Sequence, residues 1–254
     1  MTSFVLKLIA CIAMLIDHSA LVFEAQLSAV DPWVYIVCRM IGRLAFPVFA
    51  MCIGEGVIHT SSPKKYLARM LLFAFIAQIP FSLMVGTQTA SFHIDLFGRA
   101  IPVYGSCSVM VTLFLGLAAC VSIHEGVHVG AAFAIAAACI LDRTIGMDYG
   151  LTGVLLIICL YLARSNRFFR MLMIMLFAIC LYIEPLKQLG HQLIKGDGPI
   201  TLSSSVLFCS ATMLSSLLVL CYNKRKGQSS KLLIYLFYPV HMLILWIMWL
   251  LAAN

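Results

Sequence analysis

Apolar runs about as long as a membrane span follow one another along almost the whole sequence, with only short polar breaks between them. Of the 254 residues, 63% are hydrophobic and only 11% are charged, whereas about a quarter of the residues in a soluble domain are charged. A soluble protein needs polar and charged residues on its surface, so this composition excludes a soluble protein. Because each span needs about 20 apolar residues, the spans leave no room for a separate soluble domain. The sequence therefore predicts an all-α, multi-pass integral membrane protein.

The polar breaks divide the chain into about nine candidate spans, which we interpret as one transmembrane domain covering residues 1–254. Residues 87–104, between the third and the fourth span, are expected to form a loop or a re-entrant segment. The candidate spans are residues 4–24, 33–58, 66–86, 105–123, 127–141, 149–163, 168–186, 200–222 and 232–252.

Lysine and arginine residues gather in three short connections, at residues 62–65, 164–170 and 223–231. Each connection follows an even-numbered candidate span, so all three fall on one side of the membrane. Loops rich in Lys and Arg remain in the cytoplasm, which predicts a cytoplasmic N-terminus and a C-terminus on the outer side. Membrane orientation thus explains the formal charge of +7, and we expect no nucleic-acid partner.

The ten cysteines are scattered through apolar stretches, with no Cys-x-x-Cys pair and no His/Cys cluster at metal-ligand spacing. We interpret them as small buried hydrophobic residues and expect no metal site. No serine or cysteine stands out as a nucleophile, so any group transfer is expected to be direct rather than through a covalent enzyme intermediate.

Ionisable side chains are costly inside a bilayer and usually face a cavity or a partner, and the first candidate span carries Lys7, Asp17 and His18. Lys7 and His18 are eleven residues apart, which puts them on one helix face, about 20° apart and separated by roughly 16 Å along the axis. This layout suits an anionic donor anchored at the cytoplasmic side whose reactive end reaches mid-membrane. The alternatives are a Lys7 that extends to the membrane surface and an Asp17-His18 pair that bonds to neighbouring helices.

The second candidate span holds Arg39 and Arg43 one helical turn apart, and Pro47 can kink the helix beside Arg43 because it removes a backbone hydrogen bond. An unpaired arginine at mid-membrane is unfavourable, so we predict that Asp17 pairs with Arg43, either in an active site or as a structural pair between two helices. His241 enters the last span to a similar depth. Two histidines and Arg43 are therefore expected to converge.

Other polar residues near the span ends allow two interpretations. Glu55 and His59, one turn apart near the cytoplasmic end of the second span, are either a surface pair or functional groups. Asp148 and Tyr149, on the outer side between the fifth and sixth span, either line the entrance for an acceptor or belong to a capped loop. The remaining histidines, which we expect to be solvated, are His93, His124, His128 and His191.

Four motifs occur in order along the chain: Asp17-His18, residues 42–50 (GRLAFPVFA), residues 148–156 (DYGLTGVLL) and residues 237–241 (FYPVH). Together they resemble the conjugative-pilin acetyltransferase (TraX) family. That family is grouped with the acyltransferase-3 and lysosomal heparan N-acetyltransferase proteins, whose first span carries a basic residue and, after ten positions, a histidine, as Lys7 and His18 do here. Their Arg-x-x-Arg motif is not matched, because three residues separate Arg39 from Arg43.

The resemblance implies an acetyltransferase of the bacterial inner membrane that takes acetyl-CoA from the cytoplasm. The acceptor is then on the outer face, either a pilin N-terminal amine or the hydroxyl or amine of a cell-surface glycan. Since neighbouring residues point about 100° apart on a helix, Asp17 is expected to serve Arg43 or His241 rather than His18. The expected site consists of His18 as general base, Asp17, Arg43 and His241 as its catalytic partners, Lys7, Arg39, Lys64, Lys65 and Arg69 at the donor phosphates, and Asp148, Tyr149 and Tyr238 at the acceptor.

Two other functions stay open at the level of sequence. Ionisable residues inside spans also serve proton relays, which allows a proton-coupled transporter or a lipid flippase. A non-enzymatic assembly factor of a pilus or secretion system is the third hypothesis. Binding of coenzyme A at the cytoplasmic face distinguishes the acetyltransferase from both. The sequence leaves open the identity of the acceptor, the length of the acyl group and the oligomeric state.

Overall fold

The structure, a computed structural model, describes residues 1–96, 99–195, 203–225, 227 and 231–252. A helix lies in each candidate span, so the predicted helical architecture is confirmed. The elements are α1 (Ser3–Val22), α2 (Glu24–Val30), α3 (Pro32–Gly42), α4 (Ala45–His59), α5 (Pro63–Gly86), β1 (Phe92–Leu96), β2 (Arg99–Val103), α6 (Val109–His124), α7 (His128–Thr144), α8 (Gly150–Leu162), the 3₁₀ turn η1 (Ala163–Ser165), α9 (Arg167–Leu181), α10 (Ile183–Lys195), α11 (Ser204–Leu220) and α12 (Lys231–Ala252).

Several of these helices have the length and composition of membrane spans. Within the described residues, four segments qualify: α1, α3 and α4 taken together, α5, and residues 234–252 of α12. The bent pair α9–α10 makes a fifth if it is counted as one span, and α6, α8 with η1, and α11 are apolar but shorter. These lengths agree with a membrane protein, while the number of nine crossings and the cytoplasmic N-terminus stay predictions.

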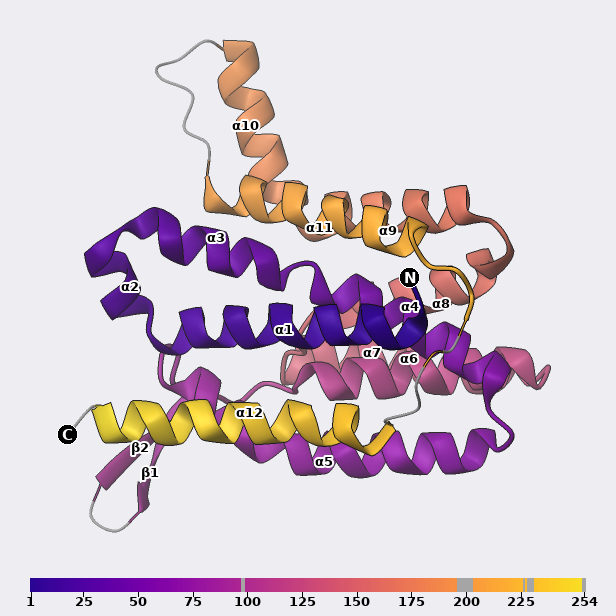
Figure 1. The fold of residues 1–254 in the computed structure, drawn as a ribbon, viewed down its shortest axis with the longest axis horizontal. Helices are drawn as coiled ribbons and strands as arrows, with labels where there is room; N and C mark the ends of the chain where they lie inside the picture. Colours follow the sequence, from indigo (N-terminus) through magenta and orange to yellow (C-terminus); the bar gives the residue numbers. More distant parts are fainter. Residues whose placement is uncertain (97–98, 196–202, 226, 228–230, 253–254) are drawn as a thin grey trace.

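The long helices run side by side between two ends of the molecule (Figure 1). The N-terminus, the α4–α5 turn and the α8–α9 turn lie at one end, where α11 also finishes and α12 begins, whereas α12 finishes at the opposite end. The described residues of the three basic connections therefore lie at the same end of the bundle, as the positive-inside interpretation requires.

Helix α4 lies at the centre of the packing. It contacts α1, α6, α8 and α11, and most of its residues are buried, among them Val48 and Met51. Its neighbours contribute further fully buried side chains, such as Leu117 of α6 and Ile157 of α8. The polar residues at the two ends of α4 are consequently enclosed by other helices.

The second candidate span is not one helix but two, with a break at Arg43 and Leu44. Pro47 has no N–H to donate to the carbonyl of Arg43 four residues earlier, which explains why the helix is interrupted here. A side chain at Gly42 would clash with Asp17, so glycine is needed for α3 to approach α1 this closely. The break lets residues before and after it face different neighbours.

Within residues 87–104, which were expected to form a loop or a re-entrant segment, the structure has two strands, β1 and β2. Strands β1 and β2 pair in antiparallel register, with Phe92 opposite Val103 and Ile94 opposite Ile101. The hairpin lies at the end of the bundle opposite the N-terminus (Figure 1). The Gln78 side chain holds its exit, donating to the Ser106 carbonyl at 2.8 Å.

Candidate active site

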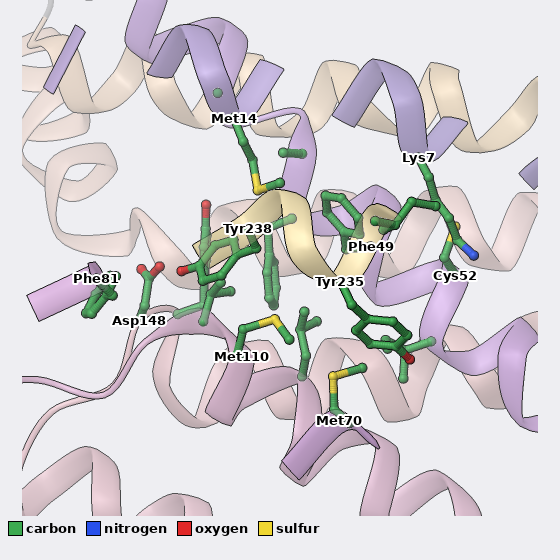
Figure 2. Close-up of a pocket in the computed structure, with 18 of the residues that line it drawn as sticks. Lys7, Met14, Phe49, Cys52, Met70, Phe81, Met110, Asp148, Tyr235 and Tyr238 are labelled. Atoms are coloured by element: carbon green, nitrogen blue, oxygen red, sulfur yellow. The ribbon is translucent and has the colours of Figure 1, made fainter. Parts of the chain in front are cut away.

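A cavity of about 520 Å³ lies between α1, α4, α5 and α12, with further walls from α3, α6 and the start of α8. Most of its wall consists of apolar, methionine and tyrosine side chains, and its charged groups gather at two ends. Figure 2 shows Lys7 at one end and Asp148 at the other, with Tyr238 and Met110 between them. We call these the Lys7 end and the Asp148 end. The cavity thus connects two groups of polar residues through an apolar interior.

Two histidines from the first and last helices are in direct contact. His18 Nδ1 lies 2.8 Å from His241 Nε2, and the two rings are nearly parallel. His241 Nδ1 in turn lies 2.6 Å from the carbonyl oxygen of Phe237. His18 lines the cavity and His241, 5% exposed, is buried behind it. The structure therefore brings together the two histidines that the sequence placed at a common depth.

The partners of this pair determine where its protons are. A carbonyl oxygen can only accept, so His241 Nδ1 carries the proton and donates it to Phe237. In a neutral His241 the other nitrogen, Nε2, is then an acceptor, and His18 Nδ1–H must be the donor to it. Two adjacent buried imidazolium ions would repel each other, which favours neutral rings. It follows that His18 Nε2 keeps a lone pair and is the basic nitrogen of the pair.

Asp17 is paired with Arg39, not with Arg43 as the sequence predicted. Arg39 donates to Asp17 Oδ1 at 2.7 Å and also reaches the Asp17 carbonyl at 3.4 Å. The prediction was wrong because it assumed a continuous helix, whereas α3 ends at Gly42 and places Arg39 against α1. The ion pair links α1 to α3 next to the histidines.

Arg43 occupies the break between α3 and α4 and faces other partners. Its guanidinium lies over the Phe208 ring, 5.3 Å from the ring centre, and hydrogen-bonds with the Tyr149 side chain. It remains within electrostatic range of Asp17 and Asp148. Its Nε is buried and has no hydrogen-bond partner among the described residues. Arg43 therefore lines the cavity and keeps one buried donor beside it.

A strained turn presents Asp148 and Tyr149 to the cavity. Tyr149 has a left-handed backbone with φ of 61°, which is unfavourable for a residue other than glycine, and its ring stacks on Phe46 at 3.9 Å. Thr112 fixes the same turn by donating to the Asp148 carbonyl at 2.6 Å. Asp142 accepts from the Leu151 N–H at 3.0 Å and so caps α8. The turn is both a capped loop and part of the cavity wall.

Tyr238 lies beside the histidine pair. It is buried, and its ring makes edge contacts with His18 and His241, with centroid distances of 6.3 and 5.9 Å. Its side chain also bonds with the backbone of Val109 on α6. Figure 2 shows Tyr238 in the middle of the cavity wall. Tyr238 therefore lies between the histidine pair and the Asp148 end of the cavity.

The Lys7 end contains only some of the predicted donor-binding residues. Lys7 and Arg69 line the cavity there, whereas Lys64 and Lys65 are exposed on the first turn of α5 and do not line it. Arg39, assigned to the same group, lies instead beside Asp17, about ten residues further along α1 than Lys7. The structure thus keeps two of the five predicted cations at this end of the cavity.

Sequence reasoning missed several residues of this wall. Tyr66 and Tyr235 line the cavity at the Lys7 end, and Tyr235 hydrogen-bonds with Arg69. Each tyrosine is three residues away from a predicted site residue, Tyr66 from Arg69 and Tyr235 from Tyr238. Helical spacing could therefore have identified both, because residues three apart share a face.

Glu55 and Arg170 form a buried ion pair that the sequence did not predict. Glu55 Oε1 lies 2.8 Å from an Arg170 nitrogen, and the two residues are 9% and 2% exposed. The sequence assigned Arg170 to a cytoplasmic basic loop and Glu55 to a pair with His59, whose Nε2 is 3.8 Å from the other carboxylate oxygen. Arg170 also donates to the Arg164 carbonyl. The pair ties α4 to the start of α9 and to the basic turn before it.

Among the residues that the structure describes, no group of three or more His, Cys, Asp or Glu side chains could hold a metal ion. A model of the TraX protein family matches residues 3–249 of the chain. A probable fimbrial assembly protein, FimC of serogroup H1 from Dichelobacter nodosus, is 43% identical over 84 residues, which is 33% of this chain and 33% of that protein. The matched segment therefore spans about a third of the length of this curated relative. No solved structure matches.

Proposed function

Because the chain belongs to the TraX protein family, we propose that it is a membrane acetyltransferase with a role in pilus or fimbrial assembly. It takes an acetyl group from acetyl-CoA at the cytoplasmic side of the inner membrane and transfers it to an amine or hydroxyl at the outer face. Similarity to a probable fimbrial assembly protein supports the pilus-related part of this proposal. The residues of the cavity support the chemical part.

The observation that carries the proposal is a cavity that leads from a cationic end to a histidine with a free basic nitrogen. Its volume of about 520 Å³ lies within the range of about 300–1,000 Å³ for small-molecule pockets. Lys7 and Arg69 at one end suit the phosphates of the donor, and the apolar interior suits the extended arm that carries the thioester. The thioester then reaches His18, roughly 16 Å along α1 from Lys7.

The transfer needs one base and one carbonyl-polarising group. His18 Nε2 removes a proton from the acceptor as its nitrogen or oxygen attacks the thioester carbonyl carbon, and a tetrahedral intermediate forms. When that intermediate collapses, the C–S bond breaks and the thiolate takes the proton from His18, giving free coenzyme A. The guanidinium of Arg43, which lines the cavity, stabilises the negative charge on the carbonyl oxygen in this proposal. Asp17 and Arg39 hold α1 and α3 in place around this centre.

A non-enzymatic role in fimbrial assembly is the second candidate, because the name of the curated relative describes assembly and no chemistry. Such a factor has no need for a cavity with a base in it. The two candidates are separated by activity rather than by a pilus phenotype, because either one predicts an assembly defect when the gene is deleted.

The test is transfer of labelled acetyl from acetyl-CoA by the purified protein in nanodiscs, with a pilin-type peptide bearing a free N-terminal amine and a glycan as acceptors. Wild type and the control His128→Gln, altered at an exposed histidine at the start of α7, should transfer acetyl. His18→Gln should lose about 10²–10⁴-fold in rate, as expected when a general base is removed, while it still binds acetyl-CoA. An active His18→Gln protein would refute the base assignment, and an inactive wild type would favour the assembly factor.

A further inference from the structure

Helix α10 has two faces of opposite character. Its apolar residues recur three or four positions apart and so gather on one side of the helix, while polar residues occupy the other side. The apolar face carries Ile183, Leu186, Leu189 and Leu193, and the opposite face carries Glu184, Lys187, Gln188 and His191.

The two ends of the apolar face of α10 are uncovered, and Leu186 and Leu189 between them are half-buried. Ile183 is 42% exposed and Leu193 is 59% exposed. Gly190 lies on the same face, and a side chain built on it would meet nothing within 4 Å. Among the described elements, α10 makes its main contacts with α9 and α11. On the polar side, Lys187 and Glu184 form an exposed ion pair at 2.7 Å.

The direction of α10 indicates what covers this face. The helix leaves α9 at an angle of 75°, and Figure 1 shows it projecting sideways from the bundle near the end opposite the N-terminus. Pro185 explains the bend, because it cannot donate to the carbonyl of Leu181, where α9 ends. If α9 runs across the membrane, α10 lies close to the membrane plane.

We propose that α10 lies in the outer interface of the bilayer, with its leucine face among the lipid acyl chains and its charged face in water. An in-plane helix with one apolar and one charged face is the geometry of interfacial membrane helices. Lipid is the occupant rather than a protein, because the face is a single helix wide and lacks the aromatic and arginine residues that anchor protein interfaces. The proposal does not depend on acetyltransferase activity.

The test places an environment-sensitive fluorescent amino acid at Leu193 or, as the matched control, at Gln188 on the polar face. The full-length protein is reconstituted in nanodiscs that contain lipids brominated either near the headgroup or near the chain ends. Headgroup-proximal bromine should quench residue 193 several-fold more than residue 188, and aqueous iodide should quench residue 188 more.

Three results would overturn the proposal. Equal iodide quenching at both positions means that the helix stands in water. Quenching of both positions by bromine at the chain ends means that α9 and α10 form one broken span. Protection of residue 193 from both quenchers means that a protein surface, such as a second copy of this chain, covers the face.

Discussion

The pairing of Asp17 with Arg39 gives the sharpest test of the arrangement around the histidines. Arg39→Ala removes the one salt-bridge partner that Asp17 has among the described residues and leaves a carboxylate in a site where the two side chains are 11% and 15% exposed. Breaking a buried pair from one side costs about 3–5 kcal/mol. Because some exposure remains, we expect the lower value, about 3 kcal/mol of unfolding free energy, which is roughly a hundredfold in the folding equilibrium.

Two further variants make the test specific. Arg43→Ala removes a contact with an aromatic ring and a hydrogen bond with a tyrosine, and should cost only about 1–2 kcal/mol. Adding Asp17→Asn to Arg39→Ala removes the orphaned charge and should restore part of the loss, as a coupled pair requires. Unfolding by SDS in bicelles, followed by tryptophan fluorescence, gives the three free energies. The observed pairing is refuted if Arg43→Ala lowers the unfolding free energy more than Arg39→Ala does. It is also refuted if Asp17→Asn lowers the unfolding free energy as much in the Arg39→Ala protein as in the wild type.

Three other predictions follow from the same geometry. His241→Phe keeps a ring but removes the acceptor that orients its partner histidine, so turnover should fall about 10–100-fold, as for other lost orienting partners, with unchanged acetyl-CoA affinity by calorimetry. Lys7→Ala should weaken acetyl-CoA binding, most strongly at low salt, whereas Lys64→Ala, outside the cavity, should leave it unchanged. Glu55→Ala leaves Arg170 buried without its anion, and the unfolding free energy measured in SDS should fall by about 3–5 kcal/mol.

The helices could be predicted from the sequence because hydropathy acts over whole spans. Each apolar run contains a helix, and the parity of the basic loops agrees with their common end in Figure 1. Hydropathy could not predict where a hydrophobic span is broken into two helices. Pro47 predicted a kink, but hydropathy did not show that the kink is a full break at Arg43 and Leu44, or that Gly42 packs against Asp17 next to it. The bend after Leu181 and the pairing of β1 with β2 likewise depend on local backbone preferences, which hydropathy does not measure.

The sequence predicted how far along the bundle the site residues lie, but not the direction in which each side chain points around its helix. Counting residues from the span ends placed His18 and His241 at one level, and their contact at 2.8 Å agrees with this. The same count could not decide between Arg39 and Arg43 as the partner of Asp17, because the answer depends on how far the chain rotates at the helix break. Arg170 was assigned to a loop for a similar reason, since a cluster of arginines does not reveal which one turns inward.

The hydrogen bonds of the histidine pair also bear on the choice between acetyl transfer and proton transport. A relay needs each group to accept a proton on one side and release one on the other. Here His18 donates to His241, and His241 donates to the Phe237 carbonyl, which has no proton to release and cannot hold one. The chain of bonds therefore ends inside α12, and a proton taken up by His18 Nε2 has no onward path through His241. Such a pair is suited to holding a proton briefly and returning it to the same cavity, which is what a general base does when a thiolate leaves.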